Sequence, residues 1–297
     1  MLTRSLPREN RLAVAAALAA YTMWGFLPIL FNAMHGAASL QVVAHRVIWG
    51  MLFLIVVVSV KMRWGVMAQI VRTPRLLAQL ALSATFIATN WLLYILAVRH
   101  GHVLEASLGY FINPLVNVLL GIVVLGERLR RVQMAAVGLA TAGVVIFAVE
   151  GGSGPWMALA LAFTFSVYGL LRKIAAVPSL EGLMVETTLL FPIAAGYLLL
   201  HPGVTPITHL PIDTAVLLVL TGPATAMPLL LFTFAAQRMP YSTLGLFQYT
   251  SPTIQFVLAL AMFHEPFKPI HALVFGLIWG GLALYVRDTF LGDRAAE

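Results

Sequence analysis

The apolar residues of the chain fall into long uninterrupted runs, and most charged residues lie in the short segments between them. A run of about 20 apolar residues is long enough to cross the apolar core of a bilayer as a helix. Because the runs do not alternate with polar residues, they predict membrane helices and not barrel strands. The ten predicted spans are residues 12–31, 40–60, 76–98, 104–125, 132–149, 155–171, 183–200, 214–234, 241–263 and 270–286.

The Lys and Arg residues predict how these spans are oriented. With the first segment placed inside, fifteen of the 18 basic residues fall on inner segments. Only Arg99 and Lys268 fall in outer loops, and Arg46 lies within a span. Cytoplasmic loops of membrane proteins carry such an excess of basic residues. We therefore predict a multi-pass protein of the bacterial inner membrane with both termini in the cytoplasm.

Composition supports an all-α integral membrane protein. Hydrophobic residues make up 61% of the chain and charged residues 10%, against about 45–50% and about 25% in soluble domains. The net charge of +7 would suggest nucleic acid in a soluble protein, but here the basic residues flank apolar runs, so we expect the lipid bilayer as the partner. The chain has no cysteine, which excludes disulfides, thiol chemistry and cysteine-bound metal.

A shift of 138 residues reveals an internal repeat. It pairs Pro114 with Pro252, Glu127 with Glu265, Gly138 with Gly276 and Gly143 with Gly281. Each unit holds five spans, and an odd number makes the second unit enter the membrane from the opposite side. We therefore predict two inverted five-helix repeats, residues 11–149 and 155–287. Inverted repeats are typical of secondary transporters whose substrate site lies near the midplane between the halves.

Several stretches in order resemble one family. They are "AHRVIWG", "TNWLLYILAV", "LGYFINPLVNVLLG", "LGERL", "PWMALALAFTFSVYGLLRK", "PLLLFTFAAQR" and "LGLFQYTSPTIQF" followed by "HEPF". Together they resemble the EamA transporters of the drug/metabolite transporter superfamily, and most closely the RarD-like branch, over about residues 10–287. The resemblance implies ten helices in two inverted repeats around a central cavity. It also implies export of small metabolites or drugs without ATP.

Ionisable residues within spans are costly in lipid and point to function. His45 and Arg46 lie in the second span and Glu186 in the seventh. We expect these side chains to gate the transporter, to bind a charged group of the substrate or to carry a proton. The alternative is that they reach the interface or make structural hydrogen bonds.

Aromatic and amide side chains within spans are the other candidates for substrate binding. They are Tyr21, Trp24, Asn90, Tyr94, Tyr110, Asn113, Asn117, Tyr168, Gln248, Tyr249 and Gln255. The alternative for this set is hydrogen bonding between helices. Pro114 and Pro252 are candidate hinges because each removes a helical hydrogen bond, although static curvature would explain them as well.

Two further features have structural interpretations. Glu127 and Glu265 follow spans and predict an ion pair or a cap that joins consecutive helices. The small residues of "AAVGLATAG" and "FGLIWGGLALY" predict close helix packing within each repeat or with another subunit.

The leading interpretation is a secondary transporter that exports small organic metabolites or amphiphilic drugs by alternating access. Aromatic or bulky apolar amino acids are the favoured substrates. We expect no enzyme, no metal site and no cofactor, because no Walker loop, metal-ligand spacing or nucleophile–base pair is present. The alternatives are a passive channel or facilitator and, from another class, a membrane-embedded enzyme or assembly factor. We expect a monomer, with a dimer as the alternative.

Overall fold

The structure is a computed structural model, and it describes residues 8–34, 37–99, 103–150, 156–262 and 269–292. All regular elements in these ranges are helices. They are α1 (Arg8–Asn32), α2 (Ser39–Val60), α3 (Trp64–Val71), α4 (Pro74–Arg99), α5 (Val103–Val123), α6 (Arg131–Glu150), α7 (Trp156–Ile174), α8 (Ser179–Leu200), the 3₁₀ helix η1 (Ile207–His209), α9 (Ile212–Ala236), α10 (Tyr241–Phe247), α11 (Thr250–Ala261) and α12 (Pro269–Gly292).

Each predicted span overlaps a helix or a pair of helices, and the regular elements of the described ranges agree with the predicted all-α class. Within the described residues, seven helices are long and apolar enough to cross a membrane: α1, α2, α4, α6, α7, α8 and α9. This makes the chain a multi-pass membrane protein. The short helix α3 is not among the predicted elements, because the segment between α2 and α4 is too short to span a membrane.

The ninth predicted span is broken in the structure. Residues 241–263 were expected to form one helix, but α10 ends at Phe247 and α11 begins at Thr250. A proline clashes with the carbonyl group four residues before it, and for Pro252 that residue is Gln248. The amide of Ser251 donates to the Gln248 carbonyl at 3.1 Å instead. Pro114, its partner in the repeat, lies inside the continuous helix α5.

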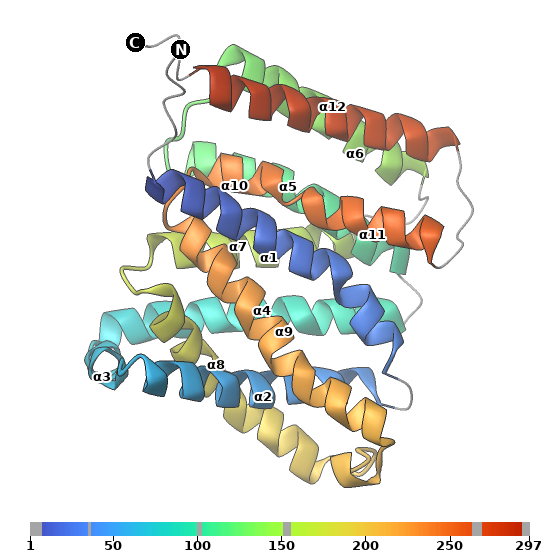
Figure 1. Ribbon diagram of the computed structural model, residues 1–297. Helices are drawn as coiled ribbons and strands as arrows, with labels where there is room; N and C mark the ends of the chain where they lie inside the picture. The colour runs from blue at the N-terminus through green and yellow to red at the C-terminus, as the bar shows by residue number, and fades with distance from the viewer. Residues whose placement is uncertain (1–7, 35–36, 100–102, 151–155, 263–268, 293–297) are drawn as a thin grey trace.

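Consecutive long helices run back and forth, so the same end of the bundle holds most basic residues (Figure 1). At this basic end α1 begins, α2 ends, α4 begins, α5 ends, α7 ends and α8 begins. Helix α6 also begins there, and α9 and α12 end there. The described basic residues at this end are Arg8, Arg11, Lys61, Arg63, Arg72, Arg75, Arg128, Arg130, Arg131, Arg172, Lys173, Arg238 and Arg287. The opposite end of the bundle is called the far end below.

Helices α6 and α12 pack along each other at one side of the bundle (Figure 1). A Cβ atom on Gly281 would lie 2.6 Å from the carbonyl oxygen of Ala136, and one on Gly143 would lie 3.0 Å from that of Val274. The two glycines therefore allow the close approach. The predicted seam exists, but it joins one half of the chain to the other and does not lie within each half.

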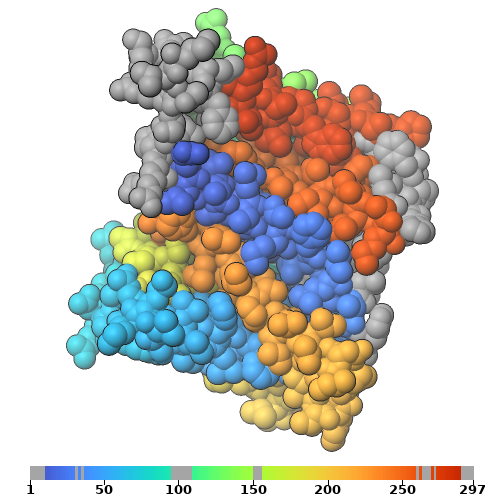
Figure 2. All heavy atoms as spheres, in the orientation of Figure 1, coloured from blue at the N-terminus to red at the C-terminus, as the bar shows by residue number. Residues whose placement is uncertain are grey.

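Many large apolar side chains lie on the outside of the molecule, among them Val56, Val145, Ile193 and Leu220. A soluble monomer rarely exposes apolar patches of this extent, so this surface suits contact with lipid. In the space-filling view, α1 and α9 lie side by side between α2 and the pair α11 and α12 (Figure 2). The buried residues beneath α1 and α9 form the main core and surround the cavities described next.

Candidate functional site: two cavities on either side of Arg46

A cavity of about 640 Å³ lies between α1, α2, α4, α5, α7, α9 and the junction of α10 with α11. Its walls come from the middles and the far halves of these helices, and Met34, Ala37 and Ser39 line it at the far end. Ligand pockets for small molecules enclose about 300–1,000 Å³. We call this space the large cavity; it has the size of a binding site for a small organic solute.

Nine of the predicted residues line the large cavity. They are Tyr21, Trp24, Arg46, Asn90, Tyr94, Tyr110, Gln248, Pro252 and Gln255. The repeat had suggested that polar residues around Pro114 and Pro252 face a shared space. Gln248 and Gln255 line the cavity near Pro252, and Tyr110 lines it from α5. Sequence reasoning did not single out Trp91, Phe165, Thr225 and Ser251, which also line it.

Arg46 is the basic side chain in this wall. Its Nε–H donates to Oγ1 of Thr225 at 2.8 Å, and its guanidinium carbon lies 5.1 Å from the ring centroid of Trp91. These contacts fix the side chain from two neighbouring helices. No acidic side chain lines the large cavity among the described residues, so its fixed charge is positive.

The aromatic walls of the cavity are packed against one another. The rings of Tyr94 and Tyr110 have centroids 5.9 Å apart, and Trp24 meets Phe165 at 5.7 Å with an interplanar angle of 80°. Gln255 donates to the backbone carbonyl of Trp24 at 3.4 Å. Such a rigid aromatic surface with a few amides suits the apolar body of an amphipathic solute.

Asn113 and Asn117 do not line the large cavity, which corrects the prediction that they face it. The Oδ1 atom of Asn113 accepts a hydrogen bond from Ser166 at 3.3 Å, and Nδ2 of Asn117 donates to Oε1 of Gln248 at 2.9 Å. Both side chains are at most 1% exposed. The amides join helices, because an unpaired amide is costly in an apolar interior.

Tyr249 and His45 are also absent from the lining. Tyr249 is fully buried in the core beneath α6 and α12, and His45 is 6% exposed. Pro114 lies on α5 away from the lining, and its carbonyl oxygen would lie 2.8 Å from a Cβ atom at Gly245. The close contact of α5 with α10 requires glycine at that position.

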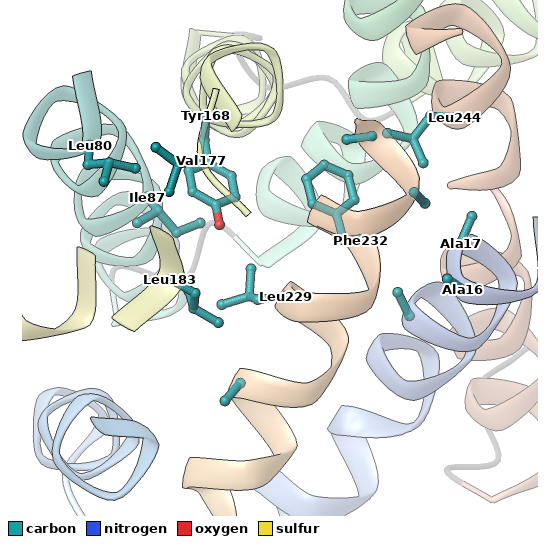
Figure 3. Packing of buried hydrophobic residues seen from close by; sticks show 14 of the residues in the cluster. Ala16, Ala17, Leu80, Ile87, Tyr168, Val177, Leu183, Leu229, Phe232 and Leu244 are labelled. Carbon is teal, nitrogen blue, oxygen red and sulfur yellow. The ribbon is translucent and has the colours of Figure 1, made fainter. Parts of the chain in front are cut away.

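Tyr168 and Glu186 face a second, small cavity of about 20 Å³ that lies deeper in the bundle. The Tyr168 hydroxyl points toward Ile87, Leu183 and Leu229, which also line this space (Figure 3). The two cavities share five residues of wall: Arg46, Ile87, Trp91, Thr225 and Leu229. Arg46 therefore lies between the predicted substrate space and the predicted intramembrane carboxylate.

Sequence reasoning missed the partner of Glu186. Arg172 is fully buried, and its Nε lies 3.5 Å from Oε1 of Glu186, which is 1% exposed. The guanidinium packs directly on α8 at Gly182, where no side chain would fit. In the sequence Arg172 directly follows the predicted span 155–171, so it is one of the fifteen basic residues assigned to inner segments.

Further contacts hold the helix ends together at the basic end. The ammonium group of Lys173 donates to the carbonyl oxygens of Ala236 at 3.0 Å and Met239 at 2.6 Å, which joins α7 to the end of α9. Gln237 donates to the carbonyl of Arg172 at 3.2 Å. The large cavity does not reach these contacts, so in this structure its described walls lie toward the far end.

Glu127 caps a helix of the other half of the chain. Gly126, with a φ of 68°, ends α5 in the left-handed conformation and turns the chain back. The Glu127 carboxylate then accepts hydrogen bonds from the amides of Tyr241 at 2.6 Å and Ser242 at 2.9 Å. The predicted cap is present, but it serves α10 and not the next helix along the chain. Glu265 lies outside the described residues.

Comparisons with known proteins identify the family. The family model described as the EamA-like transporter family matches residues 11–149 and 152–287. The chain belongs to this family. Two relatives and one solved structure are similar to the chain over most of its length.

The chain is 43% identical to protein RarD of Escherichia coli, over 97% of this chain and 98% of that protein. It is 31% identical to the chloramphenicol-sensitive protein RarD of Pseudomonas aeruginosa, over 93% and 94% of the two chains. A crystal structure with 21% sequence identity superposes with a TM-score of 0.72 over 92% of this chain and 96% of the other, and shows the same fold.

These findings make the chain a RarD-like EamA transporter and a membrane transporter of the drug/metabolite type. Within the described residues of this EamA transporter, no group of three or more His, Cys, Asp or Glu side chains could hold a metal ion. The charged side chains that line the cavities among the described residues are Arg46, which borders both, and Glu186, which borders the small one.

Proposed function

We propose that this EamA transporter is a secondary exporter of small organic solutes, with the large cavity as its substrate site. The observation that carries the proposal is a 640 Å³ cavity with aromatic walls, amides and Arg46. In the proposed cycle the cavity opens alternately at the basic end and at the far end. The helix-end contacts at the basic end would separate in the opposite state.

The favoured substrates are amino acids with aromatic or bulky apolar side chains. A substrate carboxylate would pair with Arg46, because charge-assisted hydrogen bonds to guanidinium are strong and directional. The rings of Trp24, Phe165 and Tyr110 would enclose the apolar side chain. An amphiphilic drug fits the same walls, and the name of the Pseudomonas aeruginosa relative supports chloramphenicol as a probe.

The remaining predictions belong to this proposal. They are ten crossings in two inverted five-helix repeats with hinges at Pro114 and Pro252, location in the bacterial inner membrane with both termini in the cytoplasm, and a monomeric state with a dimer as the alternative. The interruption beside Pro252 supports a hinge there, because it divides the predicted span into two helices, α10 and α11, that contact α5 and α1 respectively. The basic end would face the cytoplasm.

The main alternative is a passive channel or facilitator of the same fold; a membrane-embedded enzyme or assembly factor is a more distant one. Purified protein in liposomes separates them. We would measure uptake of labelled phenylalanine, leucine and chloramphenicol, with and without an excess of unlabelled solute inside. A carrier gives saturable uptake that the internal solute accelerates, whereas a channel gives linear uptake without acceleration. Failure of every amino acid would contradict the favoured substrate class.

A further inference from the structure

Glu186 has an unusual environment for a carboxylate inside an apolar bundle. It is 1% exposed, and the polar groups that reach its carboxylate are Arg172 and Ser83. Its one ion pair is the 3.5 Å contact with Arg172. Burial of an ionised carboxylate with so few hydrogen bonds costs free energy, because a low dielectric favours the neutral form.

The small cavity beside this carboxylate has room for one water molecule. Its volume of about 20 Å³ exceeds the roughly 10–15 Å³ that one water molecule needs. The Tyr168 hydroxyl, which lacks a hydrogen-bond partner among the described residues, borders the same space. One layer of shared side chains, Arg46 and Trp91 among them, separates it from the large cavity.

We propose that Glu186 is a proton-binding site of the transport cycle. This inference rests on the proposed function. With Glu186 ionised, the Arg172–Glu186 pair holds α7 against α8 and closes the basic end. A proton that enters from the large cavity through water in the small cavity binds the carboxylate, so the group changes from −1 to neutral and the pair with Arg172 is lost.

The loss of the pair drives the change of state. Arg172 keeps its positive charge, and a buried charge without a partner is strongly unfavourable. It lies in the last turn of α7, so separation of α7 from α8 brings it to water at the basic end. The proton can then leave on that side, and reformation of the pair closes this end again.

The charged and polar groups that face Glu186 are few. Arg172 and Tyr168 come from α7, Arg46 from α2 across the small cavity, Ser83 from α4 and Thr225 from α9. Arg63 pairs with Glu181 one and a half turns away on α8. Among these described groups, Glu186 is the acid that borders a cavity, which makes it the proton acceptor.

Infrared spectroscopy tests proton binding without knowledge of the substrate. We would record difference spectra of the full chain in lipid between about pH 4 and about pH 9. This range includes the pKa values of carboxyl groups whose pKa is raised by their environment. A protonated-carboxyl band should appear on acidification in the wild type and in Glu181→Gln. The component of this band that belongs to Glu186 should be missing in Glu186→Gln, whereas the other acidic residues of the chain still contribute. A band unchanged in Glu186→Gln, or no such band in the wild type, overturns the proposal.

A second variant covers the case in which Glu186→Gln fails to fold with Arg172 left unpaired. The double variant Glu186→Gln/Arg172→Gln removes both charges, which is tolerated better than removal of one. It must lack the same component of the band. Glu186→Asp keeps a carboxylate and must retain a titrating band.

Accessibility of the basic end tests the link to conformation. The chain has no cysteine, so Ala175→Cys, buried after α7, supplies a single reactive thiol. We expect a maleimide that cannot cross the membrane to label it about tenfold faster with Glu186→Gln, which corresponds to about 1.4 kcal/mol. Equal rates with Gln and Glu at position 186 contradict the gating step.

Transport measurements distinguish failure of this inference from failure of the proposed function. In liposomes a pH gradient of one unit can drive an about tenfold gradient of labelled phenylalanine at one proton per solute. Glu186→Gln should abolish this accumulation, because the variant cannot re-form the pair with Arg172 that closes the basic end. If the variant still accumulates solute, the inference about Glu186 is wrong and the proposed function stands. If the wild type moves no solute, the proposed function is wrong. In that case the infrared experiment alone decides whether Glu186 binds a proton.

Discussion

The side chain of Asn117 donates from Nδ2 to Oε1 of Gln248 at 2.9 Å. This bond joins the middle of α5 to the junction of α10 and α11, where the backbone of the ninth predicted span is broken. Gln248 also lines the large cavity. The bond therefore connects the fourth predicted span to the wall of the proposed substrate site.

We expect the Asn117–Gln248 pair to stabilise the protein by a measurable coupling energy. Hydrogen bonds between membrane helices contribute about 0.6 kcal/mol on average and up to about 1.7 kcal/mol. Thermal unfolding in detergent of Asn117→Ala, Gln248→Ala and the double variant forms a cycle that isolates the pair. Additive effects of the two single changes would show that the contact contributes nothing.

The α6–α12 seam makes a prediction with a matched control. Gly281→Ala places a Cβ atom 2.6 Å from the Ala136 carbonyl oxygen, so the helices must separate. Overpacking of this kind costs about 1–3 kcal/mol. Gly276 lies on the same helix with no atom within 4 Å of the added Cβ. We expect Gly281→Ala to lower the unfolding temperature and Gly276→Ala to leave it unchanged or raised; equal shifts would contradict the seam.

The sequence predicts the secondary structure and the charged positions of this protein better than it predicts which helices a side chain contacts. Apolar runs predict helices well because backbone groups in lipid must bond within their own segment. Arg46 could be singled out because a charge in an apolar run is costly wherever it points. Asn113 and Asn117 could not be placed, since their polarity is local but the helix that each meets is set by packing of α5 on α7 and α10.

The burial of Arg172 is a second feature that could not be predicted from the sequence. Its position after an apolar run, next to Lys173, is typical of an interfacial cation. Its burial arises because the start of α8 folds back over the end of α7 and places Gly182 on the guanidinium. No periodicity in the sequence encodes that contact.

The Glu127 cap predicts a local change in backbone protection. Glu127→Gln removes the charge that the amides of Tyr241 and Ser242 meet at the start of α10. Loss of a helix cap costs about 0.5–2 kcal/mol, so we expect faster hydrogen exchange at residues 241–244. Arg128→Gln alters the neighbouring exposed residue and is the control. Unchanged exchange in Glu127→Gln would mean that the cap does not hold α10.

Arg46 makes the sharpest prediction for the substrate site. Gln at this position keeps hydrogen-bonding capacity but removes the charge that would meet a substrate carboxylate. A hydrogen bond to a charged group contributes about 1.5–3 kcal/mol, so we expect Arg46→Gln to raise the KM for labelled phenylalanine by about tenfold to about a hundredfold. Uptake of phenylalaninamide, which lacks the carboxylate, should change much less.

Two controls separate this effect from a general loss of structure. Arg238→Gln removes an exposed arginine that stacks on Phe234 at 3.8 Å, and it should leave both KM values unchanged. Arg46→Lys keeps the charge but cannot reproduce the planar contacts with Thr225 and Trp91, so an intermediate KM is expected. If Arg46→Gln takes up the acid and the amide with unchanged KM values while the wild type discriminates between them, the carboxylate binds elsewhere in the cavity.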